Sequence, residues 1–269
     1  MVEITNDFPE AVLDDDGLDA VDDLFGEDDA AREEEPVAGL TDEPIFGTLL
    51  RRVIQQLWPD DAVMTDFVTY VVPLLSDQLG HVTAKGGDFV LTQLAEGANA
   101  DKVSRYAHDQ SMRAHLINGL FPVLHVASTL QRWAAPQFRY YDDTVRRVFM
   151  AGYVLHDWLK LPEVEAELAT HGLNHGAVNP VQHRAVVETI FRQWCNTLGL
   201  ERFLEPIGGV ETLLHDLIFV ACNTQIKWGT LRNVAALPNL SLPGRQRNLA
   251  ENLSRLADYL TYLGRDRAK

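Results

Sequence analysis

Apolar residues recur at steps of three and four along most of the chain from Pro44 onward, and alternation with a period of two is scarce. A three-to-four spacing places apolar side chains on one face of an α-helix, whereas a period of two is typical of strands. The pattern therefore predicts an all-α body. We expect helices at 46–57, 61–79, 88–95, 104–134, 142–160, 162–170, 181–198, 210–224 and 245–264.

Helix boundaries are clearest around the predicted helix 181–198. Asn179 followed by Pro180 is typical of a helix start, because asparagine caps the first amides and proline fits the first turn. Gly199 is expected to end this helix. Two segments read as irregular connections, PQFRYYDD at 136–143 and the Pro- and Gly-containing NVAALPNLSLPGR at 233–245.

The first 43 residues differ in composition from the rest of the chain. They contain seventeen acidic residues and one basic residue, Arg32, whereas the remaining sequence contains 22 acidic and 22 basic residues, so the net charge of −16 belongs to this segment. An acidic segment with few aromatic residues cannot offset its ordering entropy by burial. We predict a disordered acidic tail over 1–43 and one domain over 44–269. The tail is expected to serve solubility or to imitate a polyanion that competes for a basic surface.

Cysteine usage and hydropathy narrow the class of protein. The two cysteines, Cys195 and Cys222, form no CxxC motif, which excludes a disulfide scaffold or cysteine-rich zinc site and suits a reducing cytoplasm. The acidic N-terminus is unlike a signal peptide, and no apolar run reaches the roughly 20 residues of a membrane span. The sequence predicts a soluble cytoplasmic protein without membrane association.

A His-Asp pair, His156 and Asp157, lies within the segment GYVLHDWLK. The predicted helix that precedes it is apolar over most of its circumference, which indicates a central helix. Burying an imidazole and a carboxylate there is costly unless each has a partner, and a metal ion is one such partner. Gly152, one turn earlier, is expected to leave open space beside His156. The alternative is that Asp157 acts as a helix cap or forms an ion pair with an arginine, such as Arg146 or Arg147.

Two further polar residues, His115 and Asp258, interrupt other apolar helices. His115 lies in the first half of SMRAHLINGLFPVLHVASTLQ, and Asp258 lies in LSRLADYLTYL near the C-terminus. On a helical wheel Asp258 points almost opposite a leucine stripe, so the pattern by itself leaves both a surface position and a place in a site open. The stripe consists of Leu249, Leu253, Leu256, Leu260 and Leu263.

Taken together, these segments resemble the HD phosphohydrolase superfamily. VLHDWLK resembles the His-Asp-x-x-Lys signature, and RLADYL resembles the terminal Ala-Asp motif. More narrowly, SMRAHLINGLFPVLHVASTLQ, GYVLHDWLKL and ACNTQIKWGT resemble the N-terminal HD nuclease region of the large subunit of type I-D CRISPR interference complexes, over about 57–263. Those subunits continue into palm-like and helical domains absent here. The resemblance therefore implies a stand-alone HD component or a fragment of such a subunit.

The resemblance implies an HD-domain helical bundle in which His115, His156, Asp157 and Asp258 surround one or two divalent ions. Imidazole and carboxylate ligands suit Mn, Fe, Co, Ni or Zn, and the oxygen donors also admit Mg. Such an ion would acidify a water for attack on a phosphodiester. Asp157 and Lys160 are the expected catalytic residues, with Lys160 stabilising charge or positioning a phosphate. The alternative for Lys160 is a solvated lysine that favours the helix dipole.

A second His-Asp pair, His215 and Asp216, competes for a place in the same site. His183 and His215 are candidates for binding a second metal or the substrate, and Asp216 is an alternative to Asp258 as the last ligand. No clear His-His pair occurs in this region, so both a one-metal and a two-metal site stay open.

The resemblance also implies a reaction and partners. It points to cleavage of single-stranded DNA in CRISPR type I-D antiviral interference, within an effector complex containing guide RNA and beside a separate helicase. Composition alone does not indicate DNA binding, because the body has no basic run. Its seventeen arginines could still line a groove, and Trp133, Trp158 and Trp228 could stack bases. The alternatives are a nucleotide phosphohydrolase and a catalytically silent helical scaffold of the CRISPR complex.

Overall fold

A computed structural model of the chain describes residues 45–80, 82, 84, 111–224 and 237–266. Within these residues 77% are helical and no strand is present, which confirms the all-α prediction. The predicted acidic tail over 1–43 and the predicted helix 88–95 lie outside this part of the chain. None of the described helices combines the length and hydropathy needed to cross a membrane.

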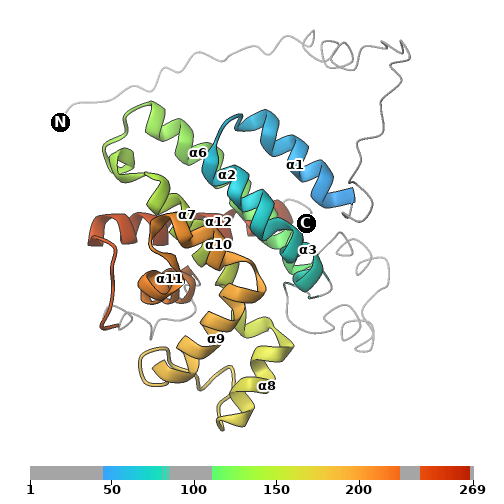
Figure 1. Cartoon of the computed structure of the whole chain (residues 1–269), viewed down its shortest axis with the longest axis vertical. Coiled ribbons are helices and arrows are strands. Elements are labelled where there is room, and N and C mark those ends of the chain that lie inside the picture. Colours follow the sequence, from blue (N-terminus) through green and yellow to red (C-terminus); the bar gives the residue numbers. More distant parts are fainter. Residues whose placement is uncertain (1–44, 81, 83, 85–110, 225–236, 267–269) are drawn as a thin grey trace, which may run out of the picture. The chain divides into compact units, whose positions relative to one another are not determined.

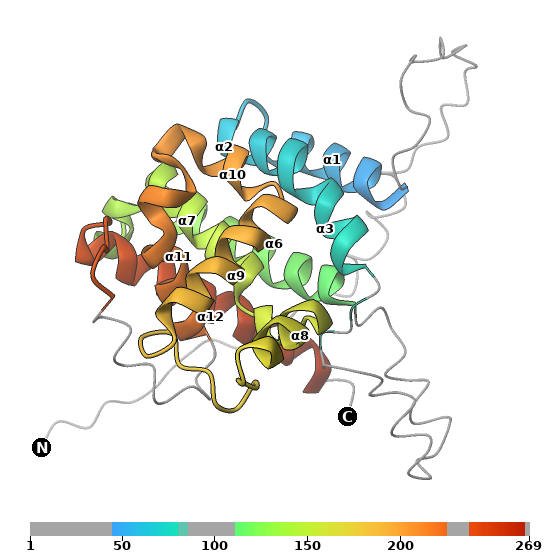
Figure 2. The same cartoon turned by 60° about the horizontal axis from the view of Figure 1, so that its bottom comes forward.

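The helices follow the predicted order with shifted boundaries (Figures 1 and 2). The described α-helices are α1 (Ile45–Leu57), α2 (Ala62–Asp66), α3 (Val72–Leu79), α6 (Met112–Arg132), α7 (Asp143–Leu155), α8 (Pro162–Thr170), α9 (Arg184–Thr197), α10 (Leu200–Leu204), α11 (Gly209–Thr224) and α12 (Gly244–Asp266). A π-helical segment, η3 (Phe67–Val71), joins α2 to α3. Short 3-10 helices are η4 (Pro136–Tyr140), η5 (Trp158–Lys160) and η6 (Glu205–Ile207).

Helix α7 lies at the centre of the described core, as its apolar circumference predicts. It packs against α11 and α12, and α12 also packs along α6. From Val148 through Leu155 every residue of α7 is buried. A helix covered on all sides must satisfy any polar group at its end from within the protein, which is the situation of His156 and Asp157.

Gly152 allows α7 and α11 to pack closely, so the prediction of open space beside His156 is wrong. A Cβ atom at Gly152 would lie 2.5 Å from Cγ1 of Val220 on α11. The missing side chain is replaced by the neighbouring helix, because protein interiors are close-packed.

The start of α9 differs from the prediction, whereas its end agrees. The Asn179 side chain accepts hydrogen bonds from the amides of Val181 (2.9 Å) and Gln182 (3.1 Å), but it caps a turn, and α9 begins at Arg184. Gly199 adopts a left-handed φ of 69° and ends the helix as expected. The chain then enters α10, which the sequence pattern did not reveal.

Helix α12 does not bury its leucine stripe as a whole. Leu249 and Leu253 are buried, but Leu256 is 37% exposed. The wholly buried positions are small residues, Ala250, Ser254 and Ala257, which let α12 approach its neighbours closely. This rotation of the helix turns Asp258 away from the surface, with a side chain 13% exposed.

Candidate metal site

Three buried side chains from two helix ends form one cluster. His115 lies in the first turn of α6, which is capped by Ser111, whose Oγ accepts a hydrogen bond from the amide of Ala114 (3.2 Å). His156 is the C-cap residue of α7, and Asp157 begins the turn into η5. Ligand atoms of His115, His156 and Asp157 all lie within 4.8 Å of one another, so this group could hold a metal ion.

The separations within the cluster fit metal coordination. The Nε2 atoms of His115 and His156 are 3.3 Å apart, and each lies 3.5 Å from Oδ2 of Asp157. Ligand atoms of a tetrahedral ion with bonds near 2.0–2.1 Å are separated by about 3.3–3.4 Å. The three atoms therefore match one face of such a tetrahedron.

Asp258 of α12 approaches the same two histidines. Its Oδ1 atom lies 3.7 Å from Nε2 of His115 and 3.6 Å from Nε2 of His156. This oxygen is buried and has no hydrogen-bond partner among the described residues. Because a buried carboxylate oxygen without a partner is costly, the atom is suited to receive a cation. The surface position that the helical wheel allowed for Asp258 is wrong.

The backbone of α7 fixes the tautomer of His156. Nδ1 of His156 lies 2.6 Å from the carbonyl oxygen of Tyr153. A carbonyl can only accept, so Nδ1 carries the proton, and in the neutral ring Nε2 presents its lone pair to the cluster. The Tyr153 ring stacks on the imidazole, with centroids 4.6 Å apart and planes inclined by 8°. The apolar pattern did not single out Tyr153, although its position three residues before His156 places it on the same helix face.

Burial and charge set the protonation of the cluster. Burial, with the neighbouring His156 and Lys160, lowers the pKa of His115 to about 4. Burial also acts to lower the pKa of His156, but Asp157 and Asp258 outweigh it and raise that pKa. For Asp157, burial acts to raise the pKa, and the nearby His156 and Lys160 charges outweigh it and lower it. A neutral His115 and an ionised Asp157 are the forms that bind metal, whereas the raised pKa of His156 favours an imidazolium that must release its Nε2 proton when a metal binds.

Lys160 forms an ion pair with the Asp157 carboxylate of the cluster. Its Nζ atom lies 2.6 Å from Oδ2 of Asp157 and 2.6 Å from the carbonyl oxygen of Ala84. The side chain is 22% exposed, which differs from the fully solvated lysine of the alternative interpretation. Lys160 holds Asp157 in place and adds positive charge beside the carboxylate.

The arginines that the sequence offered as partners for Asp157 are paired elsewhere. Arg146 contacts Asp61 at 2.6 Å. Arg147 forms an ion pair with Asp66 and donates to the carbonyl oxygen of Phe203 at 2.6 Å. These contacts fix α7 to α2 and α10, so the alternative in which Arg146 or Arg147 neutralises Asp157 is wrong.

His215 and Asp216 on α11 hold the connection that precedes α12. Nε2 of His215 lies 2.8 Å from Oε1 of Glu188, and its Nδ1 accepts the amide of Asn239 at 3.0 Å. Asp216 is fully buried, and its Oδ2 accepts the amide of Ser241 at 2.7 Å. Both ring nitrogens of this histidine already have partners.

His183, the other candidate for a second metal or substrate contact, stands at the start of α9. Its Nδ1 atom accepts a hydrogen bond from the amide of Asn179 at 2.9 Å. The side chain therefore closes its own turn. The structure does not bring His183, His215 or Asp216 into the group formed by His115, His156 and Asp157.

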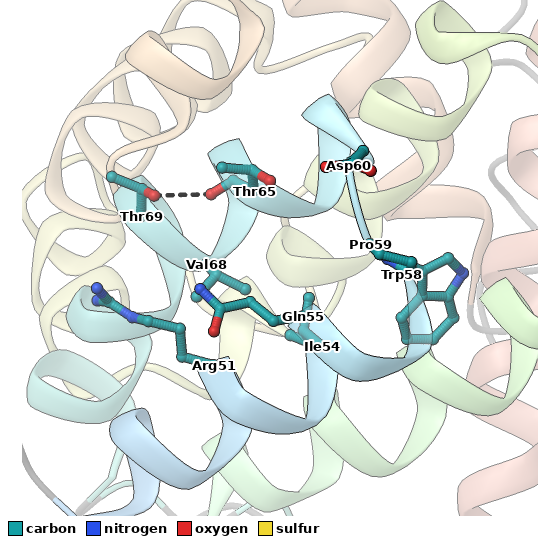
Figure 3. A pocket seen from close by; sticks show the side chains of 9 residues that line it. All are labelled: Arg51, Ile54, Gln55, Trp58, Pro59, Asp60, Thr65, Val68 and Thr69. Carbon is teal, nitrogen blue, oxygen red and sulfur yellow. Dashed lines mark hydrogen bonds between the residues drawn. The ribbon is translucent and has the colours of Figure 1, made fainter.

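Two cavities lined by described residues contain none of the cluster residues. One, of about 360 Å³, lies between α1 and the α2–η3 segment (Figure 3). Trp58, Gln55 and Arg51 line one side of it, and Thr65 and Thr69 line the other. Both threonine hydroxyls donate to backbone carbonyls one turn earlier. This cavity contains no histidine or cysteine, and no function follows from it.

Comparisons of the chain with protein families, with curated protein sequences and with solved structures gave no match.

Proposed function

We propose that the protein is a metal-dependent phosphodiesterase that cleaves single-stranded DNA. The observation that carries the proposal is the buried triangle of His115, His156 and Asp157, with separations of 3.3, 3.5 and 3.5 Å. Two imidazoles and a carboxylate at such separations form a donor set for a divalent transition metal.

Asp258 is proposed as a fourth ligand, because its buried Oδ1 faces both histidines without a hydrogen-bond partner in the described part of the chain. A divalent ion bound there would acidify a water and stabilise negative charge on a phosphate. The mixed donor set admits Mn, Fe, Co, Ni or Zn, and Mg if further oxygen ligands come from water.

The protein's own groups prepare this site. The Tyr153 carbonyl keeps the lone pair of His156 Nε2 directed at the cluster. Lys160 keeps Asp157 ionised and is 22% exposed, so its ammonium group is placed to attract a phosphate to the same corner. A cation on the substrate side and a buried donor set behind it are an arrangement suited to phosphoester hydrolysis.

The HD-type assignment, the choice of single-stranded DNA and the partners rest on the sequence resemblance. We propose on that basis that the protein acts in a CRISPR effector complex with guide RNA and a helicase. The segments VLHDWLK and RLADYL support this, because they contribute His156, Asp157 and Asp258, three of the four residues that meet in the cluster.

The test measures metal binding and DNA cleavage with the full chain. Protein stripped with a chelator is titrated with Mn, Ni or Mg by calorimetry, and a single-stranded oligonucleotide is then incubated with each loaded sample. His156→Gln and Asp157→Asn should abolish cleavage and weaken metal binding, with unchanged circular dichroism. His171→Gln is the matched control, because His171 is an exposed histidine paired with Glu167.

Three other results would contradict the proposal. Intact oligonucleotides with phosphate release from mononucleotides would indicate a nucleotide phosphohydrolase at the same site. Absence of metal binding and of hydrolysis would leave a helical scaffold. Undiminished cleavage by both variants would refute the assignment of the cluster as the active site.

A further inference from the structure

Three arginines lie on elements that pack together at the ends of α6 and α12 remote from the candidate metal site. Arg132 ends α6, Arg139 lies in η4, and Arg245 lies in the first turn of α12. Helix α12 packs against η4, and η4 packs against α6. Both views show the connection between α6 and α7 beside the N-terminal end of α12 (Figures 1 and 2). All three arginines are exposed.

Tyr140 organises two of these arginines. The guanidinium carbon of Arg139 lies 4.7 Å from the centroid of the Tyr140 ring, and that of Arg245 lies 5.6 Å from it. Arg245 also donates a hydrogen bond to the Tyr140 hydroxyl. Guanidinium groups held over an aromatic ring lose less freedom when they bind a further group, because their orientation is already restricted.

The positive charge of these three side chains is not neutralised by any described carboxylate within 4 Å. Elsewhere exposed arginines are paired, as Arg192 is with Glu211 at 2.8 Å and Arg255 with Glu251 at 2.8 Å.

The acidic groups closest in sequence differ in their partners. Asp142 accepts the amide of Val145 and the side-chain amide of Gln246, which are neutral groups, so it keeps its negative charge and offsets part of the positive charge. Asp143 is paired with Arg146.

An exposed tryptophan directly follows Arg132 in the chain. Trp133 is the C-cap residue of α6, directly after Arg132, and is 77% exposed. The indole ring has a large apolar face, and at this exposure that face is open to stack on another planar group. An unpaired arginine cluster with an open aromatic face is the composition of surfaces that bind single-stranded nucleic acid, where cations contact phosphates and aromatic rings stack on bases.

We propose that Arg132, Trp133, Arg139 and Arg245 form a binding surface for single-stranded nucleic acid, here named the arginine corner. The proposal deepens the proposed function, on which it rests for the identity of the strand as a substrate. The arginine corner would hold the strand at a distance from the bond that is cleaved.

Helix lengths give the span between the corner and the metal site. On α6 His115 and Arg132 are separated by about 25 Å, and on α12 Arg245 and Asp258 are separated by about 20 Å, at about 1.5 Å per residue. A stacked strand advances about 3.4 Å per nucleotide, so about six or seven nucleotides would bridge the two sites. The proposal therefore requires a strand of at least this length.

Binding in the presence of a chelator tests the arginine corner without cleavage. The probe is a fluorescent single-stranded oligonucleotide of about sixteen nucleotides, the upper end of common site sizes. The double variant Arg139→Gln/Arg245→Gln should weaken binding about tenfold, and the slope of log affinity against log salt should fall by about 1.4, or 0.7 for each lost phosphate contact. Trp133→Ala should weaken binding without changing this slope.

Arg202→Gln is the matched control. Arg202 is an exposed arginine on α10 that lies 6.0 Å from the Tyr70 ring centroid, so it has the same charge and a similar aromatic neighbour away from the corner. It should leave binding unchanged. An equal loss with Arg202→Gln would show non-specific charge attraction and overturn the proposal, as would equal binding of duplex DNA that is insensitive to Trp133→Ala.

The two proposals fail in distinguishable ways. Corner-dependent binding by a protein that cleaves no DNA with any metal would refute the proposed function and support the arginine corner. Cleavage by wild type with unchanged oligonucleotide affinity and KM in Arg139→Gln/Arg245→Gln would refute the corner and leave the proposed function standing. If both hold, the double variant should show a raised KM for oligonucleotides longer than about six nucleotides, the bridging length at 3.4 Å per nucleotide.

Discussion

Replacement of Gly119 by alanine tests the close approach of α6, α7 and α12 on which the proposed metal site depends. A Cβ atom at this position would lie 2.0 Å from the Tyr153 hydroxyl oxygen and 2.7 Å from the carbonyl oxygen of Ala257. Real Cβ contacts are essentially never shorter than 3.0 Å. The Tyr153 ring is fully buried, and the Ala257 atom in contact is a backbone oxygen of α12. Neither contact can therefore be relieved by the movement of a flexible side chain.

The expected cost is that of overpacking a well-packed core, about 1–3 kcal/mol of the free energy of unfolding. For a protein of this size the melting temperature falls by about 2–4 °C for each kcal/mol. The substitution should also weaken metal binding by about 10–100-fold, the range for loss of an orienting group behind a ligand. The reason is geometric, because Tyr153 stacks on His156 and Ala257 precedes Asp258.

The assay is thermal unfolding of chelated protein, followed by calorimetric titration with the metal that wild type binds best. Gly176→Ala is the control, because the nearest atom to its added Cβ would be 3.5 Å away and the residue is exposed. Equal melting temperatures and equal metal affinities for wild type and Gly119→Ala would refute the described packing of α12 against α6. A loss of stability with unchanged metal affinity would refute the link between this packing and the site.

Three further outcomes follow from the described contacts. Asp258→Asn should reduce the rise in melting temperature on metal addition, because a neutral amide replaces the buried carboxylate. The same rise in melting temperature for wild type and this variant would exclude Asp258 as a ligand. Burial lowers the pKa of His115 from 6.5 to about 4, so in chelated protein the unfolded chain binds this proton at a higher pH than the folded chain does. As the pH falls from 6.5 to 4, wild type should therefore lose stability relative to His115→Asn in urea unfolding. A stability difference that stays constant over this range would contradict the prediction. Asp216→Ala removes the acceptor of the Ser241 and Leu242 amides. The free energy of unfolding in urea should fall by about 1–3 kcal/mol for each buried group left without a partner. An unchanged urea midpoint would show that water replaces these contacts.

The sequence determined the helical class, the order of the helices and the central position of α7. These follow from local periodicity, because a stretch that is apolar all round can only be stable when neighbours cover it. The same reasoning identified His156 and Asp157 as polar groups that need partners. It also placed Gly199 at a helix end, since a left-handed φ there favours glycine.

Periodicity was less informative where a helix ends or turns. The pattern predicted a continuous helix to residue 160, but α7 ends at Leu155 and Asp157 adopts φ −97° and ψ 19° before η5. Apolar spacing alone does not distinguish an α-helix from a following 3-10 turn, because both bury side chains at three-residue steps. This change of direction brings Oδ2 of Asp157 to 3.5 Å from both histidines.

Tertiary structure decided which face of α12 is buried. The leucine stripe predicted one face, yet the helix buries Ala250, Ser254 and Ala257 because small side chains permit the closest approach to neighbouring helices. A sequence records which side chains share a face but not how near a neighbour can come. That distance depends on residues far away in the chain, such as Gly119 on α6, and it is what carries Asp258 to the two histidines.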